Sequence, residues 1–136
     1  MKRLKVSQDA AHDLTNKAVI NTVTSINDIE IVIKLDDLMK ERGLSQRELG
    51  MITGMRAGTI NSILNGKGTT LNKMQLVALM VGLRITDLTD LIEIRFPDNI
   101  KEEFNQETDS WIENKRKPQS IEKLLLENVI IATDKS

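Results

Sequence analysis

The chain has 136 residues, of which 40% are apolar and only 2% aromatic, so it suits one small domain with extensions and a core of aliphatic side chains and methionine. The 19 basic and 20 acidic residues leave a net charge of −1, so a nucleic-acid-binding role would depend on local rather than net charge. With no cysteine in the chain, disulfides, thiol catalysis and thiolate metal sites are excluded.

Residues 1–28 give a mixed signal. They begin with the basic run MKRLKV, and a polar stretch follows where a signal peptide would have an apolar run. SQDAAHDLTNKA fits a helix capped at Ser7, whereas VINTVTSI is rich in β-branched residues, and we expect this extension to be partly helical. No stretch of the sequence approaches the roughly 20 apolar residues that span a bilayer, so we expect a soluble, cytoplasmic protein with no membrane partner.

Two short segments show the alternation of β-strands. IEIVIK, residues 29–34, places an isoleucine at every second position. LIEIRF, residues 91–96, alternates Ile92, Ile94 and Phe96 with Glu93 and Arg95 until Pro97 ends the run. Because the two segments flank a helical block, they predict a two-strand ribbon. The alternation does not decide whether the strands pair within a chain or between chains.

The block between the strands begins with two predicted helices. LDDLMKER, residues 35–42, gathers its apolar side chains on one helical face, and Gly43 follows as a helix-ending residue. Ser45 stands three residues before Glu48, which is the spacing of a capping box. A second helix is therefore expected from this point to about Thr53.

Three more helices are predicted at residues 57–65, 72–83 and 85–92. Ile60 and Ile63 face the core in the first of them, and Leu76, Leu79, Met80 and Leu83 do so in the second. Thr86 is the expected cap of the short third helix.

Residues 98–136 are expected to form a helical C-terminal extension. Ile100, Phe104 and Trp111 share one face of a first helix, and IEKLLLENVIIA continues as a second helix behind a cap at Ser120. The intervening KRK run fits a solvated linker, with a nucleic-acid contact as the alternative. The apolar LLLENVII predicts that the extension is covered by dimerisation or by a protein partner.

The glycine-rich stretch GMRAGTINSILNGKG, residues 54–68, raises the question of a phosphate-binding loop. Gly66 and Lys67 are followed by Gly68 where a Walker A loop requires Ser or Thr, and Asn61 stands where its first glycine should be. The Walker A interpretation is therefore rejected.

Residues 46–63 instead have the spacing of a helix-turn-helix. Gly50 is the small residue that lets two helices cross closely, and Gly54 supplies the positive φ of the sharp turn. Ile60 and Ile63 turn one face of the second helix inward, so its other face is free to enter a major groove.

The segment LSQRELGMITGMRAGTINSILNGKGTTLNKMQLVALMVGLRITDLTDLIE resembles the Cro/C1-type (XRE-family) helix-turn-helix domain of phage-repressor-like regulators. The SQREL opening, the NGK after the third helix and the apolar pattern of the fourth helix stand in the family's order. The resemblance implies a mainly α fold, with a five-helix lambda-repressor-like domain at 29–97 and a short two-strand ribbon flanking it. Helical extensions at 1–28 and 98–136 complete the expected domain organisation.

The resemblance also implies which residues would bind double-stranded DNA: Gln46, Arg47, Arg56, Ala57, Gly58, Thr59, Asn61, Ser62, Asn65 and Lys67. Direct readout would depend on Thr59 and Asn61, with Arg56 as a guanine reader. Ala57 and Gly58 depart from the long polar residues common there and offer a thymine-methyl contact or close approach. Arg47 either contacts a phosphate or pairs with a local carboxylate.

Local charge agrees with this interpretation, because residues 45–73 hold four basic residues and one acidic residue. We expect a sequence-specific transcriptional regulator, a repressor that occludes a promoter as a homodimer, since one monomer with so few readers would be poorly specific. The resemblance suggests a phage or mobile-element setting, and a nucleoid location when bound. The alternative is a protein-binding module, antitoxin-like or an anti-repressor, that binds its partner through the terminal extensions.

Nothing in the sequence assembles a catalytic or metal site. His12 is the only histidine, and Asp36 and Asp37 are adjacent and so point in different directions on a helix. No nucleophile, base and oxyanion donor come together. We therefore expect no catalytic activity, no cofactor and no bound metal.

Overall fold

The computed structural model of the protein describes residues 1–6, 17–66 and 71–133. These residues form seven α-helices, one 3-10 helix and three strands, which confirms the mainly α prediction. In chain order the elements are β1 (Lys2–Lys5), α1 (Lys17–Thr24), β2 (Glu30–Ile33), α2 (Leu35–Arg42), α3 (Gln46–Thr53), α4 (Ala57–Asn65), α5 (Lys73–Leu83), η1 (Leu88–Asp90), β3 (Ile92–Arg95), α6 (Asp98–Asn114) and α7 (Gln119–Thr133). No helix within the described ranges is long and apolar enough to cross a membrane.

The chain divides into two compact units. The first unit comprises Met1–Lys5 and Glu30–Arg95, and the second comprises Val6–Ile29 and Phe96–Ser136. The predicted cap at Ser7 and the lone His12 lie outside the described residues.

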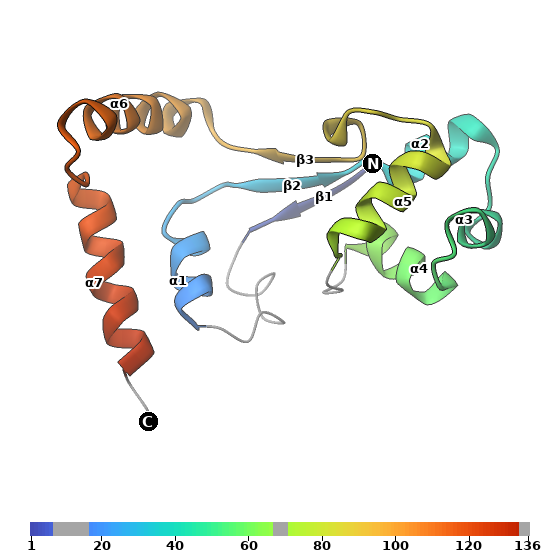
Figure 1. Ribbon diagram of the computed structural model, residues 1–136, viewed down its shortest axis with the longest axis horizontal. Coiled ribbons are helices and arrows are strands. Elements are labelled where there is room, and N and C mark those ends of the chain that lie inside the picture. The colour runs from blue at the N-terminus through green and yellow to red at the C-terminus, as the bar shows by residue number, and fades with distance from the viewer. Residues whose placement is uncertain (7–16, 67–70, 134–136) are drawn as a thin grey trace. The chain divides into compact units, whose positions relative to one another are not determined.

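The first unit contains an antiparallel sheet with the strand order β1-β2-β3 (Figure 1). β2 and β3 are the two predicted strands, and they pair within the chain, with Ile31 opposite Ile94. β1 is a third strand that the alternation pattern did not predict, and Leu4 stands opposite Ile31 in it. Leu4 packs against the core, and the other three side chains of β1 are exposed.

Local signals set the ends of the helices in the first unit. The capping box of α3 is confirmed: the backbone N–H of Glu48 donates to Ser45 Oγ, and the backbone N–H of Ser45 donates to Glu48 Oε1, both at 3.1 Å. A second capping box begins α5, where Asn72 and Gln75 bond in the same reciprocal way. Such boxes satisfy backbone N–H groups that the first helical turn leaves free.

The core of the first unit is aliphatic, as the composition predicted. Its fully buried side chains are Leu35, Leu49, Ile60, Leu79, Leu83, Leu91 and Val32. Leu76 and Met80 are partly buried and pack against this core, which confirms that they face inward. α3 and α4, which carry Leu49 and Ile60, are therefore held in place by the burial of these side chains, and the capping box adds to this in α3.

The predicted cap at Thr86 is wrong. The segment forms only a three-residue 3-10 helix, Leu88–Asp90, and its cap is the next residue, Asp87. The Asp87 carboxylate accepts hydrogen bonds from the backbone N–H of Thr89 at 2.9 Å and from its hydroxyl at 2.7 Å. A carboxylate that accepts both bonds is the stronger cap, and these bonds also lower the pKa of Asp87.

The second unit consists of α1, α6 and α7. α1 packs against α7, and Asn128 joins them by accepting from Asn21 Nδ2 at 3.0 Å and donating to Thr22 Oγ1 at 2.9 Å. None of the three helices has a buried side chain. Phe96 and Phe104 lie with ring centroids 5.9 Å apart, which fixes the start of α6.

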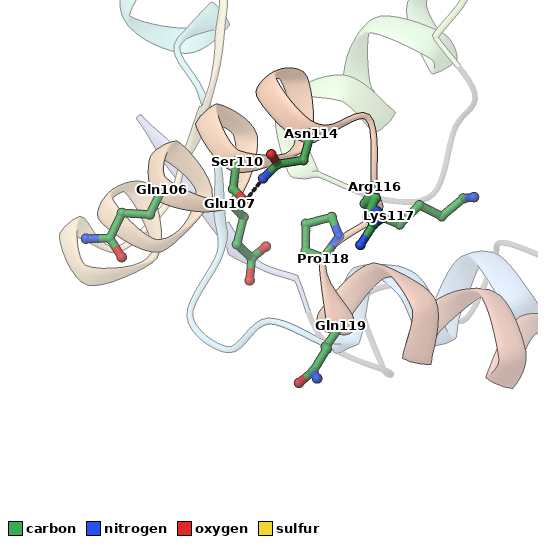
Figure 2. A pocket seen from close by; sticks show the side chains of 8 residues that line it. All are labelled: Gln106, Glu107, Ser110, Asn114, Arg116, Lys117, Pro118 and Gln119. Atoms are coloured by element: carbon green, nitrogen blue, oxygen red, sulfur yellow. Dashed lines mark hydrogen bonds between the residues drawn. The ribbon is translucent and has the colours of Figure 1, made fainter.

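The predicted cap at Ser120 is also wrong, because α7 begins one residue earlier and the Pro118 carbonyl accepts its first backbone hydrogen bonds. Proline fixes its own φ and suits the entry to a helix. Ser120 instead donates its hydroxyl to the Glu107 carboxylate at 3.0 Å and so connects α7 to α6. Figure 2 shows the elbow between the two helices, residues 115–118, which joins the end of α6 to the start of α7. In the last turn of α6, Asn114 Nδ2 donates a hydrogen bond to Ser110 Oγ.

Candidate nucleic-acid interface

α3 and α4 cross so closely at Gly50 that no side chain fits there. A Cβ on Gly50 would lie 2.9 Å from the Met55 carbonyl oxygen and 3.6 Å from Ile60 Cδ1. Gly54 ends α3 with φ 78°, in the left-handed region that a glycine adopts readily. The predicted roles of both glycines in the helix-turn-helix are confirmed.

One side of α4 is open. Ile60 and Ile63 are buried on its inner side, whereas Ala57, Gly58 and Asn61 are exposed. A Cβ added at Gly58 would meet nothing within 4 Å, so this part of the helix can be approached closely.

The polar side chains of α4 are held in different ways. Thr59 and Ser62 are half-buried. Asn65 Nδ2 donates to Asn61 Oδ1 at 3.1 Å, so these two predicted residues are connected along the exposed side. This bond leaves the Asn61 amide group to donate to another acceptor.

The first turn of α4 has no side-chain cap. Arg56 occupies the N-cap position, and its side chain accepts no hydrogen bond from the helix. The first turn also lacks an acidic residue. The positive end of its dipole is therefore not compensated by a residue of its own cap or first turn, an arrangement that suits a negatively charged ligand.

The predicted phosphate contacts are exposed cations and amides. Gln46 and Arg47 lie on the first turn of α3, and Arg47 and Arg56 make no ion pair with any other residue that the structure describes. The alternative of a local carboxylate partner for Arg47 is thus not found among the described residues. Lys67 lies outside the described ranges.

A shallow hollow beside the turn brings together residues that the sequence pattern did not connect. It is lined by Thr53, Gly54, Met55, Arg56, Thr59, Asn72, Met74, Gln75 and Ala78. The side-chain oxygens of Asn72 and Gln75 accept the bonds of the capping box, at 2.8 and 3.1 Å, so their amide NH₂ groups remain available. The Asn-x-x-Gln spacing of a capping box is the sequence signal that could have identified them.

The described residues contain no group of three or more histidines or carboxylates that could hold a metal ion. Within the same ranges, no polar or charged side chain is buried. The polar groups of α3, α4 and the first turn of α5 are therefore at the surface, where they can contact a large ligand.

Two short helices that cross at a glycine, with the second presenting a polar open side, define a helix-turn-helix DNA-binding domain. Residues 34–96 match the family model of the Cro/C1-type HTH DNA-binding domain, so this segment is a domain of that family and the protein is a DNA-binding regulator. This match confirms the resemblance that the sequence showed. Comparison with the curated proteins and with the solved structures found no match.

Proposed function

We propose that the protein is a transcriptional repressor that binds an operator as a homodimer and blocks a promoter. The observation that carries this proposal is the exposed face of α4, which includes Ala57, Gly58 and Asn61. It lies next to the crossing of α3 and α4, which leaves no room for a side chain at Gly50. α4 enters the major groove, and polymerase is excluded from the DNA that the dimer covers. The proposed setting, a phage or mobile element, rests on the family resemblance.

Direct readout is assigned to Thr59 and Asn61, with Arg56 as a guanine reader at the start of α4. A good bidentate contact provides about 1–3 kcal/mol of discrimination between bases. Ala57 and Gly58 allow close approach of the helix to a thymine methyl group. With so few readers in each protomer, useful specificity requires two half-sites about one helical turn apart.

Backbone contacts are assigned to residues on both sides of α4. Gln46 and Arg47 contact phosphates at the start of α3, while Ser62, Asn65 and Lys67 do so along and beyond α4. The uncapped first turn of α4 supplies backbone N–H groups for a further phosphate. These contacts set the register of the domain on the duplex.

Dimerisation is assigned to the exposed apolar stripe of α7, which consists of Leu125, Leu126, Val129 and Ile130. These side chains are between 45% and 67% exposed. Trp111 and Ile112, near the end of α6 in the same unit, are further exposed apolar side chains, at 38% and 62%. In a two-fold contact a patch meets itself, and the four residues of this stripe are all apolar.

The function is tested by selecting bound duplexes from fragmented genomic DNA at about 0.15 M salt, where weak phosphate-only binding fades. We expect a sharp inverted-repeat site. The double variant Thr59→Ala/Asn61→Ala should lose it, whereas the control Asn105→Ala/Thr108→Ala should keep it, because both control residues are exposed on α6. Featureless recovery of DNA, or none, contradicts the repressor proposal and leaves the protein-binding module as the alternative.

The dimer is tested by measuring solution mass by light scattering. Leu126→Glu/Ile130→Glu should convert a dimer into monomers, because it places like charges across the two-fold axis. The control Val77→Glu/Val81→Glu changes side chains of similar exposure and spacing on α5 and should leave the mass unchanged. A dimer that survives the first variant, or is lost in the second, contradicts the assignment to α7.

A further inference from the structure

β1 is a strongly basic edge strand. Its sequence is KRLK, and Lys2, Arg3 and Lys5 are all exposed. β2 is its only neighbour in the sheet that the described residues form, so β1 is an edge strand of that sheet. None of the roles assigned above to α3, α4 and α5 involves these three cations.

β1 is seated against the C-terminal end of α4. A Cβ added at Gly66, which ends α4 with φ 65°, would lie 2.6 Å from Leu4 Cδ1 and 2.7 Å from Leu4 Cδ2. The glycine therefore leaves the space that the Leu4 side chain fills. Pairing of Leu4 with Ile31 fixes the register of β1 at this position.

The cations of β1 differ from those on or next to the other two strands of the sheet. Lys34 lies 2.9 Å from the Glu93 carboxylate, and Arg95 lies 3.2 Å from it, so both charges are compensated. Lys2, Arg3 and Lys5 form no ion pair with a described residue. Exposed cations near a DNA-binding helix attract the phosphate backbone.

We propose that β1 is a second DNA-contacting element, in which Lys2, Arg3 and Lys5 bind phosphates of the strand that flanks the major groove at the C-terminal end of α4. This inference rests on the proposed function, which already places Asn65 at that strand. Successive side chains of a strand alternate between its two faces, so Lys2 lies on the face of Leu4, and Arg3 and Lys5 lie on the other face. All three side chains are exposed and can extend toward the phosphate backbone from the two faces of β1.

Phosphate contacts carry no sequence information, so β1 should raise affinity equally for all duplexes. It should also make binding more sensitive to salt, because each neutralised phosphate releases a counterion. The slope of log K against log salt changes by about 0.9 for each neutralised phosphate. The inference therefore predicts a change in the salt slope without a change in sequence preference.

The test uses the full chain and two variants that remove the same charge. Lys2→Gln/Arg3→Gln/Lys5→Gln changes β1, and Lys115→Gln/Arg116→Gln/Lys117→Gln changes the basic elbow between α6 and α7. Dissociation constants are measured for the selected site and for a scrambled duplex over about 0.05–0.3 M salt. Circular dichroism melting verifies that each variant is folded.

The β1 variant should flatten the salt slope by about 0.9 for each phosphate that is no longer neutralised, up to about 2.7. It should weaken the selected and scrambled duplexes by the same factor, and the elbow variant should match the wild type. An unchanged slope in the β1 variant, or an equal change in the elbow variant, overturns the inference and leaves the proposed function standing. A wild-type protein that binds neither duplex overturns both. If the triple variant of β1 unfolds, the salt slope is measured for the single variants Lys2→Gln and Lys5→Gln instead. The inference is overturned if both single variants have the salt slope of the wild type.

Discussion

Replacing Gly50 with alanine should destabilise the first unit, although alanine is the better helix former. In a helix interior, the exchange by itself gains about 1 kcal/mol. Here the new methyl carbon would lie 2.9 Å from the Met55 carbonyl oxygen, a backbone atom that moves only if the turn between α3 and α4 moves. Overpacking of this kind costs about 1–3 kcal/mol, so we expect a net loss on the order of 1 kcal/mol.

Two other glycines provide matched controls for this exchange. At Gly58 an added Cβ meets nothing within 4 Å, so alanine should stabilise the unit by up to about 1 kcal/mol. At Gly82 the Cβ would meet the Ile52 and Thr53 methyl groups at 3.1 Å. Because side-chain methyl groups shift more easily than backbone, we expect a change near zero.

The assay is urea unfolding of the full chain followed by far-UV circular dichroism, with the m-value compared between variants. Trp111, the only tryptophan, lies in α6 and gives a separate fluorescence signal from the second unit. The expected order of stability is Gly58→Ala, then Gly82→Ala, then Gly50→Ala. If Gly50→Ala is as stable as Gly58→Ala, the close crossing at Gly50 is not what restricts this position.

Three further predictions concern caps, charge and packing. Ser45→Ala removes the side-chain oxygen of the α3 capping box and should cost about 1 kcal/mol in urea unfolding, whereas no loss would show that the box is dispensable. Hydrogen bonds from Arg95 and Lys34 lower the pKa of Glu93 from 4.5 to about 2, so its stabilisation is complete above pH 4.5 and is lost as the pH falls toward 2. The melting-temperature difference between wild type and Glu93→Gln should therefore shrink between about pH 6 and pH 3, and a constant difference would contradict this. Leu79→Ala empties a fully buried position and should cost about 2–5 kcal/mol, and a smaller loss would show that the core collapses around it.

Much of the helix-turn-helix was predictable because its signals are local. The capping box of α3 joins Ser45 to Glu48, and the glycines that end α2, α3 and α4 directly follow the helices they stop. Each signal acts on backbone groups within one helical turn, so its effect on the helix end does not depend on the rest of the fold. The bounds of α4 and the inward position of Ile60 followed from the sequence for this reason.

The errors and omissions lie where a residue's role depends on a distant partner. Ser120 has the chemistry of a cap, but its hydroxyl bonds Glu107 on another helix. Asn72 and Gln75 line the same hollow as Arg56 and Thr59, although residues 60–71 lie between them in the sequence. Periodicity and capping rules describe only neighbours along the chain and cannot predict such contacts.

The family of residues 34–96, the helix-turn-helix and the aliphatic core could all be predicted from the order of the residues, because glycine, capping and apolar patterns act over a few residues. The pairing of β2 with β3 within the chain and the packing of α1 against α7 were visible only in the folded structure. The strand β1 was also visible only in the folded structure, because its sequence KRLK is a basic run with one apolar residue. That run becomes a strand because β2 supplies its hydrogen-bond partners and Gly66 leaves space for Leu4, and both lie far away along the chain.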